Sequence, residues 1–232
     1  MFFKKYVTAI IVAAGKGTRK ESEIPKQYMT IAGKTILELT LYKFEKNKYI
    51  DEIILVVNKE DIDYVRTSIA CNFDKIKRVL QGGKTRTESV YEGIKMAAEN
   101  SDLLLIHDGV RPFVSYKLIN TCIESASEYK ACIPVIDVTD TIKEVNDGFV
   151  EKTMDRSRLK AVQTPQAFDY HLIRECYDRI MLEDKEKFSF TDDASIVEHC
   201  GYKIKAIDGL SRNIKITTPL DLRIAEILSS IY

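Results

Sequence analysis

Long hydrophobic runs alternate with amphipathic segments over residues 7–136. Most of the runs are apolar at nearly every position, as in strands covered on both faces of a parallel sheet, and the third is a short strand. They lie at Val7–Ala14, Glu52–Val57, Ile76–Leu80, Asp102–Ile106 and Ala131–Ile136. The segments between them read as helices, at Thr35–Glu45, Lys59–Ala70, Arg86–Glu99 and Ser115–Tyr129. This rhythm predicts an α/β fold with a doubly wound, mostly parallel sheet.

The pattern changes at residues 137–158. Two short alternating segments, T-I-K-E-V and F-V-E-K-T-M, flank Asn146-Asp147-Gly148, a turn sequence that predicts a β-hairpin. A lone hairpin with few large apolar side chains is marginal in water. We therefore expect a projecting arm that packs on a second subunit of a homodimer. The alternative is an antiparallel edge of the main sheet.

The rest of the chain mixes helical and strand-like segments. Two helices, a charged loop between them and two strand-like segments are predicted at Tyr170–Met181, Asp192–His199, Glu183–Lys187, Tyr202–Ile207 and Ile214–Thr217. Thr191 is expected to cap the second helix, and Pro219 to open the last one. Because no repeat or linker interrupts the chain, we expect residues 1–232 to form one domain.

The composition is that of an ordinary globular protein. Of 232 residues, 45% are hydrophobic and 30% charged, and 35 basic residues balance 35 acidic ones. A nucleic-acid-binding protein would be basic overall, and no apolar run approaches the ~20 residues of a membrane helix. We therefore expect no nucleic-acid or membrane partner, and any anion site must be local.

Cysteine usage and the N-terminal segment both bear on the compartment. The five cysteines are scattered without a C-x-x-C pair, and the three histidines lack metal-ligand spacing. This favours a reduced, cytoplasmic protein without structural zinc. Lys4 and Lys5 before an apolar run resemble a short signal peptide, but cleavage after Ala14 would remove the first predicted strand. We therefore expect that segment to stay in the sheet.

Glycine and charge gather in three loops that follow predicted strands, at Gly15–Gln27, Gln81–Arg86 and His107–Arg111. Loops at the carboxyl ends of parallel strands share one edge of the sheet, where ligands bind. The first loop carries four cations beside its glycines: Lys16, Arg19, Lys20 and Lys26. Glycines let backbone N–H groups approach an anion that the cations neutralise, so we expect a polyphosphate site.

The first loop differs from three common phosphate motifs. A P-loop requires G-x-x-x-x-G-K-[ST], whereas Thr18 follows Gly17 here. A dinucleotide fingerprint requires a third small residue where this chain has Lys20, and the V-A-I-K strand of kinases is absent. The loop is of another type, G-x-G-x-R followed by P-K-Q. One acid near its cations, Asp108, would suit a magnesium nucleotide, since Mg²⁺ pairs phosphate oxygens with one or two carboxylates.

Seven motifs then follow one another in a fixed order. They are A-A-G-K-G-T-R, P-K-Q-Y, H-D-G-V-R-P-F, D-T-I-K-E-V, D-R-S-R-L-K-A-V-Q-T-P-Q-A-F, T-D-D-A and N-I-K-I-T-T-P-L-D-L. Together they resemble the 2-C-methyl-D-erythritol 4-phosphate cytidylyltransferase family of the non-mevalonate isoprenoid pathway, over residues 9–227. Two positions depart from the family pattern: Lys20 stands where Met is usual, and Gly109 where Ala is usual.

The resemblance implies a Rossmann-like nucleotidyltransferase fold and a reaction. CTP and methylerythritol 4-phosphate would give the CDP-linked alcohol and pyrophosphate, with Mg²⁺ that Asp108 would help to hold. The implied catalytic cations are Arg19, Lys26, Arg156 and Lys215. The implied nucleotide-binding residues are Ala13, Ala14, Gly15, Lys16, Gly17, Gly82, Arg86 and Ser89. The implied acceptor-binding residues are Asp108, Arg111, Thr141, Thr164 and Thr191, with Thr141 and Arg156 reaching the site from a partner's arm.

The residue inventory supports this chemistry beside the resemblance. A phosphate oxygen that attacks the α-phosphorus is already anionic and needs no general base. The catalyst must bring two anions together and stabilise a more highly charged α-phosphate, which requires positioning and cations. The chain supplies such cations and no credible nucleophilic triad.

Three alternatives remain open. A cytidylyltransferase for another polyol phosphate, such as ribitol 5-phosphate, tends to carry G-G-K-G-T-R and to lack the D-R-S-R-L-K run. A glycosyltransferase of related topology would need a D-x-D metal motif after a strand, and the one such triplet, Asp61–Asp63, lies at a predicted helix start. An inactive nucleotide-binding regulator would not need Arg19, Lys26 and Lys215 together.

Overall fold

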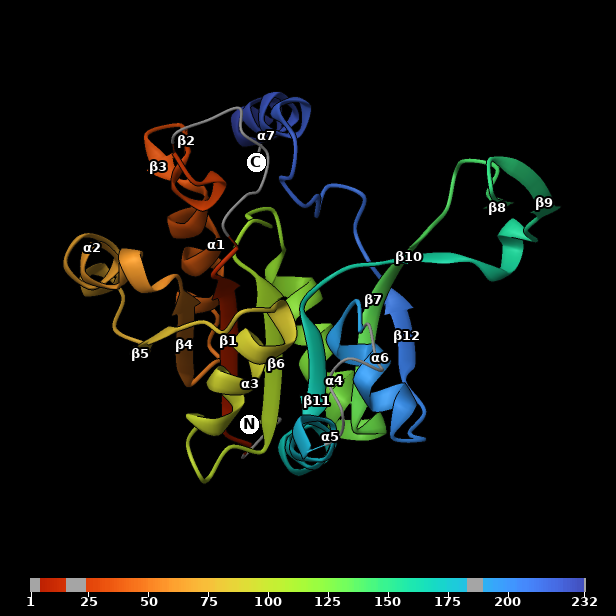
Figure 1. Ribbon diagram of the computed structural model, residues 1–232. Helices are drawn as coiled ribbons and strands as arrows, with labels where there is room; N and C mark the ends of the chain where they lie inside the picture. Colours follow the sequence, from red (N-terminus) through yellow and green to blue (C-terminus); the bar gives the residue numbers. More distant parts are fainter. Residues whose placement is uncertain (1–4, 16–23, 183–189, 232) are drawn as a thin grey trace.

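The computed structural model describes residues 5–15, 24–182 and 190–231 (Figure 1). Within these ranges the central element is an eight-stranded sheet in the order β10-β7-β11-β6-β1-β4-β5, with β12 paired to β7. Its strands are β1 (Val7–Ala13), β4 (Glu52–Val57), β5 (Ile76–Gln81), β6 (Leu103–Asp108), β7 (Ala131–Asp137), β10 (Lys160–Val162), β11 (Gln166–Asp169) and β12 (Lys205–Asp208).

The predicted mostly parallel sheet is confirmed. Strands β6, β1, β4 and β5 run parallel to one another, and β12 runs parallel to β7. Strands β10 and β11 are the antiparallel members, and they pair with β7 and β6. The continuous apolar run of β1 places it near the middle of the sheet. There Ala9 and Ile11 pack into one core layer, while Ile10 packs into the other.

Helices cover both faces of the sheet, as a doubly wound fold requires (Figure 1). They are α1 (Ile36–Glu45), α2 (Ile62–Tyr64), α3 (Arg86–Lys95), α4 (Tyr116–Tyr129), α5 (Tyr170–Leu182), α6 (Asp193–His199) and α7 (Pro219–Ile231). The core under α1 and α4 lies on one face, and the core under α3, α5 and α6 lies on the other. None of the helices in the described ranges is long and apolar enough to span a membrane.

Two predicted helices differ in detail from the observed ones. Residues 59–72 form a succession of short 3-10, α and π turns instead of the single helix predicted over Lys59–Ala70. Helix α3 ends at Lys95, short of the predicted Glu99. Just beyond its end, the Ala98 N–H donates to the Glu52 carboxylate at 3.2 Å and so leaves the helical hydrogen-bond ladder.

The C-terminal third departs from the sequence prediction at two further points. Residues 214–217 form no strand; the Ile216 N–H donates to the Val110 carbonyl at 3.0 Å and fastens the segment beside β6. Asp192 caps α6 where Thr191 was expected, because its carboxylate accepts from the Ser195 N–H at 3.0 Å in a reciprocal capping box. The charged loop predicted at Glu183–Lys187 lies outside the described residues.

The predicted hairpin is confirmed as a separate two-stranded sheet, β8 (Lys143–Asn146) with β9 (Phe149–Thr153). Asp147 and Gly148 have φ of 48° and 84°, the positive values that a type I′ turn requires. Every residue of both strands is exposed, and Figure 1 shows the hairpin standing away from the main sheet. The alternative of a main-sheet edge is therefore wrong. The packing of this arm on a second subunit stays a prediction.

Two small elements complete the fold beside α1. Strands β2 (Thr30–Ile31) and β3 (Lys34–Thr35) form a tight antiparallel pair that leads into that helix. Thr35 caps α1 through a reciprocal capping box with Glu38. Ile31 and Ile36 pack with Ile216 and with α7 in a third small core. This core places the segment that carries Lys215 above the carboxyl ends of the central strands.

Candidate active site

A cavity of about 910 Å³ lies at the carboxyl ends of β1, β4, β5 and β6. Residues from all three glycine-bearing loops line it, so the predicted convergence of these loops is confirmed. The lining also includes residues 58–60, which follow β4, and residues 215–217, which precede α7. This is the edge where open parallel sheets bind ligands.

The end of β1 forms one wall of the cavity. Ala13, Ala14, Gly15 and Lys26 all line it. The buried Gln27 side chain donates to the carbonyls of Ala13, at 3.0 Å, and Gly15, at 3.4 Å. Gln27 thereby ties the start of the short 3-10 turn that carries Lys26 to the end of the strand. Three predicted site residues of this loop, Lys16, Gly17 and Arg19, lie outside the described residues.

The end of β5 forms a second wall, where the backbone itself faces the cavity. A Cβ added to Gly82 would lie 2.5 Å from the Ala14 Cβ and 2.8 Å from the Ser89 Oγ, so no larger residue fits without displacing the wall. The Ser89 hydroxyl accepts from the Gly83 N–H at 3.1 Å and donates to the Thr85 carbonyl at 2.8 Å. The predicted pair Gly82 and Ser89 therefore shapes one rigid surface at the start of α3.

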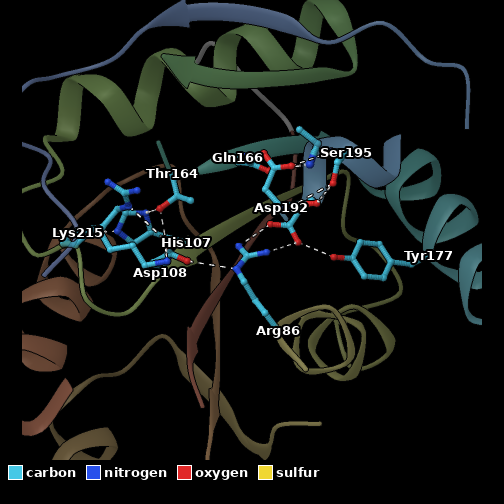
Figure 2. A network of polar contacts seen from close by, with 12 residues as sticks. Arg86, His107, Asp108, Thr164, Gln166, Tyr177, Asp192, Ser195 and Lys215 are labelled. Atoms are coloured by element: carbon cyan, nitrogen blue, oxygen red, sulfur yellow. Dashed lines mark hydrogen bonds and ion pairs between the residues drawn. The ribbon is translucent and has the colours of Figure 1, made fainter. Parts of the chain in front are cut away.

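Asp108 ends β6 and meets three cations at the cavity (Figure 2). Its carboxylate lies 3.1 Å from Lys215, 3.3 Å from Arg111 and 3.5 Å from Arg86. Burial alone would raise the pKa of Asp108, but the three cations outweigh burial and hold that pKa well below its usual range. Asp108 is therefore ionised at any physiological pH, and it joins elements that are far apart in the sequence.

Arg86 connects this cluster to α6. Its guanidinium donates to both carboxylate oxygens of Asp193, at 3.0 and 2.8 Å. Burial alone would lower the pKa of Arg86, but Asp193 and Asp108 outweigh it and raise the pKa above its usual value. Arg86 lines the cavity and remains a cation.

His107 supports Asp108 from inside the protein. It is fully buried, and burial lowers its pKa to about 4. Its Nε2 faces the Arg111 carbonyl at 3.2 Å, and a carbonyl can only accept, so Nε2 carries the proton. Its Nδ1 then accepts from the Thr164 hydroxyl at 2.9 Å, and that hydroxyl accepts from the Asp108 N–H at 3.2 Å. Both ring nitrogens are thus occupied, and His107 offers no general base to the cavity.

Comparison with known proteins identifies the scaffold. The family model of 2-C-methyl-D-erythritol 4-phosphate cytidylyltransferase (IspD) matches residues 7–230. A curated relative of that name from Clostridium beijerinckii is 46% identical over 95% of this chain and 96% of its own length, and one from Clostridium novyi is 43% identical over 94% of each. The chain belongs to the IspD family.

Solved structures of IspD proteins agree with this assignment. A 4-diphosphocytidyl-2C-methyl-D-erythritol synthase from Anaerococcus prevotii superimposes with a TM-score of 0.86 at 37% identity, covering 97% of this chain and 96% of its own. The IspD of Francisella tularensis gives 0.82 at 32% identity, covering 96% and 99%. The chain is therefore a cytidylyltransferase of isoprenoid biosynthesis, which transfers CMP from CTP to 2-C-methyl-D-erythritol 4-phosphate and releases pyrophosphate.

The remaining predicted IspD residues lie outside the cavity lining. Arg111 stands just behind Asp108, and its guanidinium also donates to the Asn213 carbonyl at 2.8 Å. Thr164 is buried, and its hydroxyl accepts from the Asp108 N–H. Thr191 is exposed near α6, while Thr141 and Arg156 are exposed on the arm. Within one subunit, then, the cavity brings the described residues predicted for nucleotide binding together with Lys26, Asp108 and Lys215, but not the arm residues.

Two residues that shape the site of this IspD chain, Gln27 and Asp193, were not predicted from the sequence. Gln27 stood in the quoted P-K-Q motif, and an amide directly after Lys26 was the available signal. Asp193 stood in T-D-D-A, where two consecutive acids gave no sign of which one is buried. The structure separates them: Asp192 caps α6, and Asp193 is fully buried against Arg86.

Proposed function

We propose that the cavity holds CTP against the ends of β1 and β5, and methylerythritol phosphate beside Asp108 and Lys215. The observation that carries this proposal is the pairing of Lys215 with Asp108, because it puts a phosphate-binding cation and a hydroxyl-binding acid side by side. The glycine surface at Gly82 suits close approach of a nucleotide to the backbone. The two substrates would then meet between Lys26 and Lys215, which both line the cavity.

In the proposed mechanism, one phosphate oxygen of the acceptor attacks the α-phosphorus of CTP. A new P–O bond forms, the bond to the β-phosphate oxygen breaks, and pyrophosphate leaves with the electron pair. No proton needs to be removed from the nucleophile, in keeping with the neutral, fully engaged His107. Lys26, together with Arg19 of the adjoining loop, would stabilise charge on the α-phosphate and pyrophosphate, while Lys215 would hold the acceptor phosphate.

Divalent metal fits this site as a companion of the nucleotide. In the described part of the chain no group of three His, Cys, Asp or Glu side chains could hold a metal ion. Asp108 offers one hard carboxylate at the cavity, and Mg²⁺ is commonly held by one or two carboxylates plus substrate phosphates. Mg²⁺ bound there would neutralise phosphate charge and orient the α-phosphate. The residues therefore suit Mg²⁺ that arrives with CTP, with Asp108 as its protein ligand.

In a homodimer, the arm residues of one subunit would contribute to the active site of the other. The arm exposes Phe149, Val145 and Val150, with 78%, 57% and 62% of their surfaces accessible, and apolar surface of this kind favours burial against another subunit. Arg156 sits at the base of the arm, where its guanidinium donates to the Thr139 carbonyl at 2.5 Å. We propose that Thr141 and Arg156 reach the acceptor phosphate in the partner's cavity.

Subunit mixing tests the shared site. Arg156→Ala and Lys215→Ala should each abolish most activity alone. If each site combines Lys215 of one subunit with Arg156 of the other, a mixed dimer contains one intact site, and random exchange should restore about a quarter of wild-type activity. Refolding the variants separately and then combining them without exchange is the control. No recovery after proven exchange would contradict the shared site.

A cytoplasmic location completes the proposal. The described cysteines, Cys71, Cys122, Cys132, Cys176 and Cys200, all carry free thiols, which suits a reducing compartment. Fractionation of cells that produce the chain with a small C-terminal tag tests this. Recovery in the periplasmic or secreted fraction would contradict it.

A further inference from the structure

The Arg86 guanidinium contacts two acids, Asp193 and Asp108, and its contact with Asp193 is the closer one. Its two terminal nitrogens form a parallel pair of hydrogen bonds with Asp193, at 3.0 and 2.8 Å. Its Nε lies 3.5 Å from Asp108, a longer contact. Figure 2 shows Arg86 reaching between Asp108 on one side and Tyr177 on the other. The two terminal nitrogens of Arg86 thus bind Asp193 and not Asp108, the acid that lines the cavity.

Asp193 is held rigidly in its place. The residue is fully buried, and the Tyr177 hydroxyl donates to its Oδ1 at 2.6 Å. Gln166 fixes the start of α6 on both sides of it, since its side chain accepts from the Ala194 N–H at 2.9 Å and donates to Asp192 at 2.7 Å. Asp193 therefore gives Arg86 a partner whose position is set by packing rather than by substrate.

Asp193 does not line the cavity, so it does not contact a substrate in the proposed mechanism. A bidentate arginine–carboxylate pair is strong and directional, so it fixes the plane of the guanidinium. Among the described residues, the second carboxylate in contact with Arg86 is that of Asp108. Without Asp193, Arg86 would turn its fork onto Asp108, whose carboxylate already contacts Lys215 and Arg111.

We propose that Asp193 is a positioning residue of the cytidylyl-transfer site, which restrains Arg86 so that Asp108 keeps an oxygen free for the acceptor. The pair Asp193–Arg86 acts from the nucleotide side of the cavity, and Asp108 acts on the acceptor side. Asp193 thereby couples α6 to acceptor binding through a single side chain. This inference rests on the proposed acceptor role of Asp108.

A double-mutant cycle tests the inference. Asp193→Asn keeps the shape of the side chain and removes its charge, and it should lower kcat/KM for the acceptor on the order of 10- to 100-fold, mainly through KM. In the Arg86→Gln background the same change should alter kcat/KM less than about twofold, because the restrained group is gone. Equal effects in both backgrounds would overturn the inference.

Ser195→Ala is the matched structural control. It removes the Ser195 hydroxyl half of the capping box with Asp192 and leaves Asp193 and Arg86 in place. The control should lower the melting temperature and leave the acceptor KM unchanged. A rise in acceptor KM equal to that of Asp193→Asn would show that loosening α6 suffices, and would overturn the positioning role.

Arg86→Lys provides a test that does not depend on how well the Asp193 variants fold. Lysine keeps the charge but cannot hold Asp193 with two parallel bonds while facing Asp108. The acceptor KM should rise on the order of tenfold, with the melting temperature close to that of the wild type. An unchanged acceptor KM would overturn the inference. Absence of cytidylyl transfer in the wild-type protein would instead refute the proposed function itself.

Discussion

The Lys215 ammonium lies 3.1 Å from the Oδ2 of Asp108, across the mouth of the cavity. Asp108 ends a central strand, whereas Lys215 belongs to an irregular segment just before the last helix. Lys215 is 41% exposed and Asp108 only 9%, so the ammonium caps a buried carboxylate from the solvent side. An incoming phosphate can therefore recruit Lys215 without first unburying it.

Replacement of Lys215 tests the acceptor-phosphate role. Lys215→Met should lower kcat/KM for methylerythritol phosphate on the order of 10²- to 10³-fold, the effect of losing one preorganised electrostatic donor. The KM for CTP should change much less. Lys205→Met is the control, since Lys205 lies on β12 over the Tyr129 ring. Equal kinetics for the Lys215 variant and the control would refute the role.

Gln27 should act through the loop that it anchors. Gln27→Met keeps most of the volume but removes the donor to the Ala13 and Gly15 carbonyls. Leaving the buried Ala13 carbonyl without a partner costs about 1–3 kcal/mol, and the loop that carries Lys26 loses its tether. We expect the KM for CTP to rise about tenfold, on the scale of 1.4 kcal/mol per factor of ten. Steady-state kinetics with saturating acceptor would measure it, and an unchanged KM for CTP would contradict the anchoring.

Much of the fold could be predicted from the sequence, because a strand that is buried on both faces is apolar at nearly every position. The run at Val7–Ala14 has almost no polar position, and β1 lies near the middle of the sheet as expected. Residues 214–217 alternate like a strand, yet their backbone pairs with no strand: the Ile216 N–H donates to the Val110 carbonyl, and the Thr217 N–H donates to the Asp221 carboxylate. The alternation of apolar and polar residues therefore predicted which side chains are buried, but not whether a neighbouring strand pairs with the segment.

Site residues could be predicted from the sequence where they directly follow a strand. Residues that hold a site side chain in place from a distant segment could not. Asp108 and its loop follow β6 directly, so topology brought them to the cavity. Asp193 reaches Arg86 from the start of α6, 107 positions later in the chain. Single-sequence patterns carry no record of such a long-range contact, which depends on the packing of α5 and α6.

Two glycine substitutions distinguish an effect on nucleotide binding from the general destabilisation that overpacking causes. Gly82→Ala puts a Cβ 2.5 Å from that of Ala14 at the cavity wall, while Gly93→Ala puts one 2.7 Å from Ile10 in the core. Each should destabilise the fold by about 1–3 kcal/mol. Only Gly82→Ala should raise the KM for CTP, because only that wall faces the cavity. A similar rise in both variants would assign the effect to stability alone.

His107 should make the protein acid-sensitive over a defined range of pH. Its pKa is lowered from 6.5 to about 4 in the folded state. Between these values the unfolded chain binds a proton that the folded chain does not, so stability is complete above pH 6.5 and is lost as pH falls toward 4. The loss should reach about 3 kcal/mol at 1.36 kcal/mol per pKa unit.

Chemical denaturation at several pH values measures this effect. His107→Gln retains an amide donor for the Arg111 carbonyl and has no titrating ring. Its stability should therefore fall much less between pH 6.5 and 4 than that of the wild type. Asp108 should contribute little in this range, because its stabilisation is lost only as pH falls below the unfolded pKa of 3.8 toward the lower pKa of the folded state. Parallel slopes for the two proteins would contradict a neutral, buried His107.

The most direct test of the central claim is a comparison of acceptors. Purified protein, Mg²⁺ and CTP are incubated with methylerythritol 4-phosphate or with ribitol 5-phosphate, and pyrophosphate release is followed together with the CDP-linked product. We predict rapid release with methylerythritol phosphate, at least about 100-fold slower release with ribitol phosphate on the scale of 2.7 kcal/mol, and loss of both in Lys215→Met. Release with ribitol phosphate and none with methylerythritol phosphate would contradict the account.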